Sequence, residues 1–499
     1  MRILVPAVCL LALSVPLAAQ GDFDFDKTTA GTLGSTLTLE VQNAPASMPL
    51  LSMVSSTAGP TPIALIDPLD PRSVSVGADL LGNWSLQLTS PTGTAAIAVP
   101  LPNDPAFNGF VFHWQTATLP GAATLFDQLS NAVTSHHAQP AVSAALPNAL
   151  LAARAIATVC PAPNRNAGMG DFLLVSGATT EFFRFRTLDS EAGPAMNAPR
   201  ALHAAATLND GRVLFTGGVD ALSAAVTAGC EIYDPVANTF TTVASMLGPR
   251  AGHAAATLAD GRVLVAGGTI TFIDLTTAIT GVVNTAEIYD PNTDTWSALP
   301  NIGGRRLLPA LTLLGNGKLL ISGGIEVTLL FGVPIAVTST NKAQLYTPAS
   351  NSWANAPNMP AGRAFHHDNQ VTLNDGRVLL TGGVLIPDLI NVANSASIDN
   401  ADLYDPVANT WTPTTMTHAR TGHSATRLAD GRVVVCGGSE GLFSAPVPLD
   451  AVAIFDPAGN TWTDLAPMTM PRVGHTAALL PDGMVVLLGP DTTGEALHF

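Results

Sequence analysis

The stretch HAAATLNDGRVLFTGG, residues 203–218, recurs 50 residues later as HAAATLADGRVLVAGG, residues 253–268. An apolar strand that ends in one or two glycines, here called the glycine element, occurs seven times in the chain. A Tyr-Asp-Pro-like element follows each copy, and a period of about 50 residues indicates a propeller or an array of repeats. We number the repeats 1 to 7 by their glycine elements at 172–177, 212–218, 262–268, 318–324, 377–383, 432–438 and 484–489.

Each repeat is expected to form four strands. The alanine-rich stretch gives the first strand, and an Asp-Gly or Asn-Gly turn such as Asp260-Gly261 leads into the glycine element, because these dipeptides favour two-residue hairpins. The Tyr-Asp-Pro element is the third strand, which its proline ends, and a Trp or Phe marks the fourth. Small alanines at 204–206 suit the crowded inner side of a ring of sheets, where packing must be dense.

The double glycine, the Tyr-Asp-Pro, the Trp and a closing Arg together resemble the kelch family of β-propellers. The resemblance covers roughly residues 139–499 and implies an all-β propeller. Repeat 7 ends after its third strand, whereas residues 140–154 align with residues 238–250, which carry a fourth strand. We therefore expect residues 140–146 to complete repeat 7 and to close a seven-bladed ring without free edges, with six blades as the alternative.

The first 20 residues predict export. One Arg, an apolar core and small residues near the end are typical of a secretory signal peptide, cleaved near Ala19 or Gln20. No later segment is apolar enough to cross a membrane. We therefore expect a secreted protein, either extracellular or periplasmic, without membrane insertion.

A separate domain is expected between the signal peptide and the propeller. Residues 21–137 alternate polar and apolar residues between Pro, Gly and Asn turns, which predicts a small antiparallel β-sandwich. The stretch LPNDPAFNGFVFHWQ, residues 101–115, looks like part of a domain that recurs in exported bacterial proteins. The propeller would then occupy residues 138–499.

The charge of the chain excludes some partners. The 499 residues include 37 Asp and Glu, 21 Lys and Arg, and a net charge of −16. Because no basic cluster exists to neutralise phosphates, we expect no binding to nucleic acid or to anionic membranes. Asp22, Asp24 and Asp26 alternate with Phe, so their carboxylates share one strand face. We interpret this face as solvated, with a calcium site as the alternative.

Three cysteines remain after the signal peptide. Cys160, Cys230 and Cys436 allow at most one disulfide, and their spacing matches no zinc motif. We expect small buried thiols in strands.

A histidine recurs at the start of five repeats and an arginine at the start of six, whereas Pro309 and Ala157 replace the histidine in repeats 4 and 1. A ring of histidines could form a metal or anion site, but a packing requirement recurs with the repeat, whereas a binding site usually breaks the symmetry. We therefore interpret both rings as structural, with each His bonded within its own repeat and with acids such as Glu231 and Glu287 beside the Arg. The residues are His203, His253, His366, His423 and His475, and Arg200, Arg250, Arg306, Arg363, Arg420 and Arg472.

Repeat 5 departs from the others at RAFHHDNQ, residues 363–370, which contains two extra residues. An insertion of two preserves strand parity, so His366, Asp368 and Gln370 are expected to point the same way. We predict that these three residues bind a ligand, together with the long loops on one face, where insertions often create binding sites. The loops are 269–285, 325–342, 384–400 and 439–451.

Two functions compete at this stage. The first is a monomeric, non-catalytic binding or scaffold protein that recognises a protein or glycan at the cell envelope without a cofactor, although calcium stays open. The second is a carbohydrate-active enzyme, a hydrolase or an oxidase like galactose oxidase, which the kelch resemblance brings in with its copper and tyrosine ligands. Copper is not expected, because the four tyrosines share one repeat position, and we favour binding. They are Tyr233, Tyr289, Tyr346 and Tyr404.

Overall fold

The computed structural model describes most of the chain and is built almost wholly from β-strands. Residues 1–20, which were predicted to be a signal peptide, and Asp368 lie outside the described residues. Within the described part, no helix has the length and hydrophobicity that a membrane crossing requires. The described residues are 24–56, 58–62, 73–76, 85–119, 128–146, 149–152, 158–161, 171–176, 179–272, 275–331, 333–366, 369–388, 394–441 and 446–499.

The chain divides into two compact units. The smaller consists of Met1–Thr28, Leu37–Val99 and Val111–Ser135, and the larger of Thr29–Thr36, Pro100–Phe110 and His136–Phe499. The break after Ser135 lies close to the boundary expected after residue 137. Sequence reasoning did not predict that the two short N-terminal stretches group with the larger unit.

The smaller unit contains antiparallel sheets, as the alternating pattern predicted. One sheet has the order β1-β3-β8, and in another β4 lies between β7 and β9. Asn131 fixes β1, because its side chain accepts from Phe25 N at 2.8 Å and donates to Phe25 O at 2.7 Å. Asp26 is only 7% exposed, so the expected solvated face is wrong for this carboxylate. The strands are β1 (Asp24–Lys27), β3 (Thr36–Gln42), β4 (Pro49–Ser55), β5 (Ala58–Pro62), β6 (Ser73–Val76), β7 (Ser85–Leu88), β8 (Ala95–Pro100) and β9 (Phe110–Thr118).

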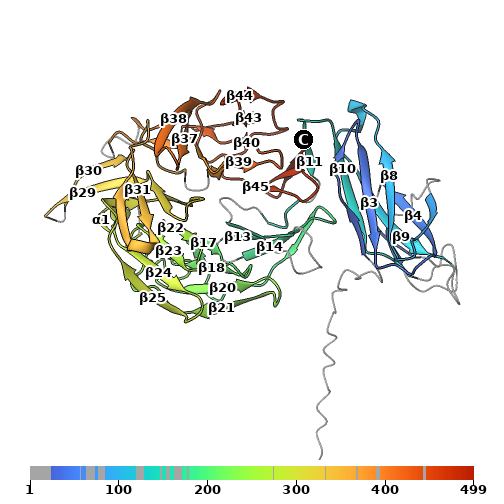
Figure 1. The fold of residues 1–499 in the computed structure, drawn as a ribbon, viewed down its shortest axis with the longest axis horizontal. Helices are drawn as coiled ribbons and strands as arrows, with labels where there is room; N and C mark the ends of the chain where they lie inside the picture. Colours follow the sequence, from blue (N-terminus) through green and yellow to red (C-terminus); the bar gives the residue numbers. More distant parts are fainter. Residues whose placement is uncertain are drawn as a thin grey trace, which may run out of the picture. The chain divides into compact units, whose positions relative to one another are not determined.

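The larger unit holds seven four-stranded antiparallel sheets among the described residues. Figure 1 shows them following one another around a ring, with first strands such as β17, β22 and β39 on the inner side and fourth strands such as β21, β25 and β44 on the outer side. Repeats 1 to 3 form β12 (Thr158–Pro161), β13 (Phe172–Ser176), β14 (Thr179–Arg184), β15 (Asp189–Ala192); β17 (Ala204–Thr207), β18 (Val213–Thr216), β20 (Cys230–Asp234), β21 (Thr239–Val243); and β22 (Ala254–Thr257), β23 (Val263–Ala266), β24 (Ala286–Asp290), β25 (Thr295–Leu299). Repeats 4 to 7 form β27 (Ala310–Leu313), β28 (Leu319–Ser322), β31 (Ala343–Thr347), β32 (Ser352–Asn355); β33 (Gln370–Thr372), β34 (Val378–Thr381), β37 (Asn400–Asp405), β38 (Thr410–Thr415); β39 (Ser424–Arg427), β40 (Val433–Cys436), β43 (Val452–Asp456), β44 (Thr461–Asp464); and β45 (Thr476–Leu479), β46 (Val485–Leu488), β47 (Gly494–Leu497).

The fourth strand of repeat 7 comes from the N-terminal side of the chain. β11 (Ser143–Leu146) pairs antiparallel with β47, with Ser143 opposite Leu497. This is the pairing that the alignment of residues 140–154 predicted. The larger unit therefore joins segments from both ends of its chain in one sheet, and this sheet has no gap where its fourth strand belongs.

Aromatic side chains connect neighbouring sheets. In repeat 3, Tyr289 packs against Trp296 with ring centroids 5.1 Å apart. Trp296 Nε1 donates to Ala244 O of repeat 2 at 2.9 Å. Trp353 and Trp411 make the same kind of bond to the preceding repeat. The Trp of the repeat therefore contributes to the joint between sheets as well as to the core of its own sheet.

Candidate functional site

The double glycine is the point at which each repeat meets the next, and we call this contact between neighbouring repeats a joint. Gly218 N donates to Arg250 O of repeat 3 at 2.8 Å. A Cβ on the preceding Gly217, whose φ is +57°, would lie 2.3 Å from the same oxygen. No side chain fits there, which explains the glycine. The bond recurs from Gly268 to Arg306, Gly324 to Arg363, Gly383 to Arg420 and Gly438 to Arg472.

The recurring histidines lie in these joints. His253 Nε2 is 2.8 Å from Thr216 Oγ1, a hydroxyl of the preceding repeat, and His423 and His475 reach the preceding repeat in the same way. We expected a bond within each repeat, which is the geometry of His203 Nδ1, 3.3 Å from Arg200 O. Burial, with the charge of the neighbouring Arg472, lowers the pKa of His475 to about 3, so this ring is neutral at pH 7.

The recurring arginines are buried and most of them meet an acid on the third strand of their own repeat. Arg200 Nη2 lies 2.7 Å from Glu231, and Arg472 Nε lies 3.0 Å from Glu495. Repeats 3 and 5 contain the corresponding pairs Arg250–Glu287 and Arg363–Asp402.

Two repeats lack the acid. Gln344 takes its place beside Arg306 in repeat 4, and Ala453 takes its place in repeat 6. Burial lowers the pKa of Arg306 to about 10, an effect that the charge of Glu326 partly offsets. Within the described residues, Nε and Nη2 of Arg420 have no hydrogen-bond partner. The joints of repeats 4 and 6 therefore contain a buried cation without a counterion on the third strand of its own repeat.

The structure describes two of the three predicted ligand-binding residues, and both contact repeat 4. β33 begins only at Gln370, so His366 lies before this strand, and Asn369 N donates to His366 O at 3.0 Å. His366 is fully buried, with Nε2 3.3 Å from Ser322 Oγ, like the other joint histidines. Gln370 accepts from Thr312 Oγ1 at 2.7 Å. Asp368 lies outside the described residues, so the site predicted from these three residues stays a prediction.

The long loops form a structured surface instead. Loop 325–342 is a hairpin of β29 (Ile325–Leu330) and β30 (Val333–Ser339), and β29 also pairs with β26 (Arg305–Leu307). Loop 269–285 contains helix α1 (Leu275–Thr280), and loop 384–400 contains β35 (Val384–Leu385) and β36 (Ala396–Ser397). We call the surface formed by these three loops the insertion face.

The insertion face has an apolar core of its own. Val282, Val327 and Val384, one from each loop, belong to a single buried cluster with Leu307 and Val337. This cluster is separate from the cores of the sheets. The loops are therefore held in place by burial of apolar surface, and they form a platform.

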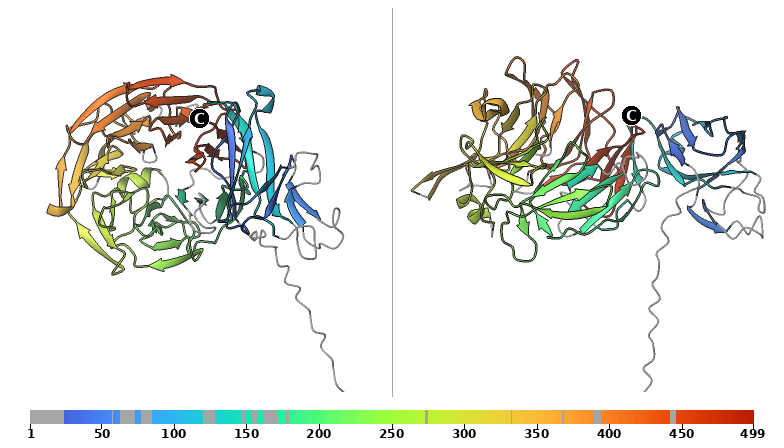
Figure 2. Two further views of the ribbon diagram at one scale, coloured as in Figure 1. Left: turned by 45° about the vertical axis from the view of Figure 1, so that its right-hand side comes forward. Right: turned by 60° about the horizontal axis from the view of Figure 1, so that its bottom comes forward.

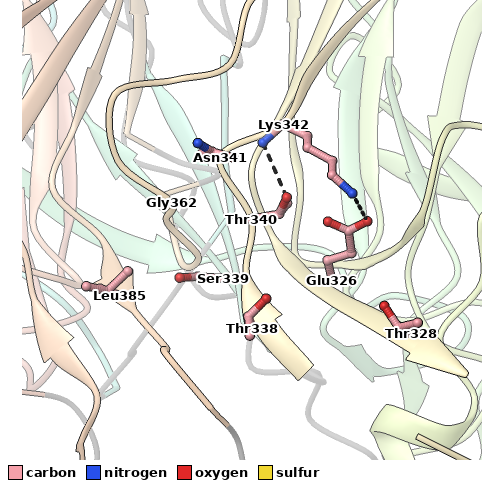
Figure 3. Close-up of a pocket in the computed structure, with 9 residues that line it drawn as sticks. All are labelled: Glu326, Thr328, Thr338, Ser339, Thr340, Asn341, Lys342, Gly362 and Leu385. Atoms are coloured by element: carbon pink, nitrogen blue, oxygen red, sulfur yellow. Dashed lines mark hydrogen bonds and ion pairs between the residues drawn. The ribbon is translucent and has the colours of Figure 1, made fainter. Parts of the chain in front are cut away.

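A pocket of about 380 Å³ opens on this face (Figure 3). Along β29, Ile325 and Val327 are buried in the loop core, whereas Glu326 and Thr328 line the pocket. This alternation follows from the two faces of a strand. Lys342 Nζ lies 2.7 Å from Glu326 Oε1 at the pocket wall.

The pocket wall is fixed by contacts between repeats 4 and 5. Ser339 N donates to Ile386 O at 2.9 Å, and Ile386 N donates to Ser339 Oγ at 2.9 Å. A Cβ on Gly362 would lie 2.6 Å from Ser339 O, so the two segments touch through their backbones. Asn341 Nδ2 donates to Met359 O at 3.3 Å. The wall is preorganised before any ligand arrives.

Beyond the pocket, the β29–β30 hairpin carries an exposed apolar tip. Figures 1 and 2 show the hairpin, in yellow-olive, projecting from the ring of sheets. Phe331 is 99% exposed, and Leu330, Val333 and Ile335 are 53%, 62% and 59% exposed. Large apolar side chains gathered in this way mark a binding surface more often than isolated ones do.

The tyrosines and cysteines occupy repeat positions. The hydroxyl of Tyr404 is 2.8 Å from Asn409 Oδ1, and the other three tyrosines each bond to a residue five positions later in the same way. Cys230 and Cys436 are free and buried, and burial raises their pKa values to about 11 and about 12. The side chain of Cys160 lies outside the described residues. In the described part of the chain, no three metal-ligating side chains form a cluster.

Comparison with known proteins agrees with the repeats. A family model described as the Kelch motif matches residues 249–303 and 420–469. Kelch-like protein terF of Aspergillus terreus is 26% identical over 327 residues, 63% of this chain and 66% of that protein. Kelch-like protein 15 of Homo sapiens is 27% identical over 188 residues, 36% of this chain and 29% of that protein. A galactose oxidase of Gibberella zeae is 28% identical over 104 residues, 21% and 12% of the two chains.

The matched segments therefore span 66% or less of the length of these relatives. A solved fungal alcohol oxidase of the AA5 family, in complex with copper, superposes with a TM-score of 0.50 at 19% identity, over 71% of this chain and 75% of that one. At that identity the likeness shows the fold alone. The repeats, the sheets and these matches together support a kelch-repeat β-propeller, the family that the motifs predicted.

Proposed function

We propose that this protein is exported and acts by binding, without catalysis, recognising a partner protein at the cell envelope through the tip of the β29–β30 hairpin. The observation that carries the proposal is the group of four exposed apolar side chains, Leu330, Phe331, Val333 and Ile335, on a hairpin anchored by its own core. Burying one such side chain stabilises a complex by about 1.5–3 kcal/mol, less the cost of association. The Kelch motif, which supports a protein-binding scaffold, agrees with this role.

The hairpin is built to dock through side chains. Pro334 lies in β30 and removes a backbone donor, and the register of the pair shifts between Thr328 and Leu329. Prolines and bulges are the devices by which edge strands resist pairing with another chain. No charged residue lies between Val327 and Val337, so the complementary surface is an uncharged apolar cleft.

The test uses the purified full chain as bait for envelope proteins, followed by titration of each captured and purified protein. Phe331→Ser should weaken binding of a true partner by about 10- to 100-fold, as loss of a central apolar anchor does. Val407→Ser is the matched control, because Val407 is 95% exposed on a turn of repeat 5.

A captured protein that binds Phe331→Ser as tightly as the native chain would contradict the tip as the recognition surface. Turnover of a carbohydrate by the native chain would instead support the carbohydrate-active enzyme that the sequence left open.

A further inference from the structure

The pocket on the insertion face is lined by charged and polar groups that take no part in the protein contact proposed for the hairpin tip. Glu326 and Lys342 contribute one negative and one positive charge, which cancel. The Lys342 side chain is 55% exposed and that of Glu326 is 15% exposed. A pair that is open to solvent through its lysine contributes about 0–1 kcal/mol to folding, so the stability role of Glu326 lies in its charge near the buried Arg306 and gives little reason for Lys342.

Hydroxyl and amide groups surround the pair. Thr338 lies directly opposite Glu326 in the hairpin, and Thr328 follows on the same face. Thr340 and Asn341 complete the polar wall, whereas Leu385, which is 40% exposed, supplies an apolar patch. In Figure 3 Thr328, Thr338 and Thr340 are drawn nearest to Glu326 and Lys342, whereas Asn341 and Leu385 lie farther to the left.

The donors and acceptors suit adjacent hydroxyl groups. A carboxylate accepts two O–H bonds and an ammonium has three donors, of which one is directed at Glu326. Two neighbouring hydroxyls on a ring can therefore donate to Glu326 and accept from Lys342 at the same time. A ligand with a net charge would be attracted by one member of the pair and repelled by the other, so the pair gives a charged ligand no net advantage, and an apolar ligand would leave the polar wall unsatisfied.

We infer that this pocket binds one neutral sugar residue through two adjacent hydroxyls held between Glu326 and Lys342. The volume of about 380 Å³ lies at the small end of the range for ligand pockets, which begins at about 300 Å³. The fixed wall between Ser339 and Ile386 means that little ordering accompanies binding. This inference goes beyond the protein contact proposed for the hairpin tip, because no residue of the tip lines the pocket.

The experiment titrates the purified full chain with glucose, galactose, mannose and N-acetylglucosamine, and with glucuronate and glucosamine as charged counterparts, using ligand-observed NMR and calorimetry. At least one neutral sugar should saturate the protein. Its charged counterparts should bind more weakly by about 10-fold or by a larger factor. Lys342→Met should weaken sugar binding by about 10-fold or more, since a bond to a charged group is lost.

Matched variants separate the pocket from general effects. Lys318→Met removes another of the chain's three lysines, from a turn outside this pocket, and should leave sugar binding unchanged. Thr338→Ala removes only a wall hydroxyl and should weaken binding about 2- to 10-fold. Phe331→Ser should weaken the protein partner and leave sugar affinity unchanged, so the two proposals fail separately.

Three outcomes would overturn the inference. The first is that no neutral sugar binds even at about 50 mM. A Kd of about 1 mM corresponds to about −4 kcal/mol, so binding of that strength would be detected at this concentration. The second is sugar binding that Lys342→Met and Thr338→Ala leave intact. The third is preferential binding of glucuronate, which would indicate an anion site centred on Lys342 alone.

Discussion

Two carboxylate–cation pairs in this protein have the same chemistry and opposite surroundings. Arg363 and Asp402 form a joint pair whose side chains are both 0% exposed. Glu326 and Lys342 form a pocket pair with side chains 15% and 55% exposed. Burial makes the joint pair costly to break, because either partner alone would be an uncompensated charge. The exposure of Lys342 makes removal of this lysine cheap and leaves the pair accessible to a ligand.

The largest expected effect comes from breaking the buried pair. Asp402→Asn keeps the shape of the side chain but leaves Arg363 charged and unpaired in the joint. The free energy of unfolding should fall by about 3–5 kcal/mol. Urea denaturation followed by tryptophan fluorescence measures the loss. A loss below about 1 kcal/mol would mean that the buried pair behaves like a surface pair.

The next effect depends on pH and concerns the joint histidines. Burial holds the pKa of His475 at about 3 in the folded chain against 6.5 for an ordinary histidine. As the pH falls, the unfolded chain therefore takes up the proton before the folded chain does. The contribution of His475 to the free energy of unfolding is fully present above pH 6.5 and is lost as the pH drops from 6.5 toward 3.

The size of this pH effect can be measured by replacing His475 alone. Each unit of pH within that window should cost about 1.4 kcal/mol for a single histidine. His475→Gln should therefore have a shallower decline between pH 6 and pH 4 than the native chain, by about 1 kcal/mol per pH unit. His418→Gln is the control, since His418 lies on a linker outside the joints. Equal slopes for the two variants would contradict a buried neutral His475.

Repeat 4 allows an acid to be added rather than removed, because Gln344 takes the place of the acid beside its buried Arg306. Gln344 accepts from Gly303 N at 2.8 Å, in the place where repeats 2, 3, 5 and 7 have an acid. Gln344→Glu changes the charge without changing the size and gives Arg306 a counterion. The free energy of unfolding should rise by about 1–3 kcal/mol. Unchanged or lower stability would show that Glu326, in the insertion hairpin, already serves as the counterion of Arg306.

Sequence reasoning succeeded where residues recur and was incomplete where they do not. The repeats predicted four strands each and the pairing of β11 with β47, because seven copies can be aligned with one another and a strand missing from one copy is recognised from the others. They could not show that His253 bonds to Thr216 of the preceding repeat, since the spacing of a repeat is the same within and between sheets.

The site was missed because its residues occur once. His366 and Gln370 were predicted to share a strand face, but only Gln370 lies in β33, and Asn369 N donates to His366 O just before that strand. The signal that could have found the pocket is the alternation of loop 325–342. Apolar Ile325 and Val327 alternate with polar Glu326 and Thr328, which is the pattern of a strand with one buried face.

The smallest expected effect on stability belongs to the pocket pair and completes the comparison. Lys342→Met should change the free energy of unfolding by about 1 kcal/mol or less, because solvent screens the exposed Lys342 ammonium. The same substitution should weaken sugar binding by about 10-fold, so stability and binding separate at this residue. In the joints the two cannot separate, since a buried pair stabilises the ring and meets no ligand. A loss of 3 kcal/mol or more in Lys342→Met would place Glu326 and Lys342 with the joint pairs and remove the reason for treating the pocket as a binding site.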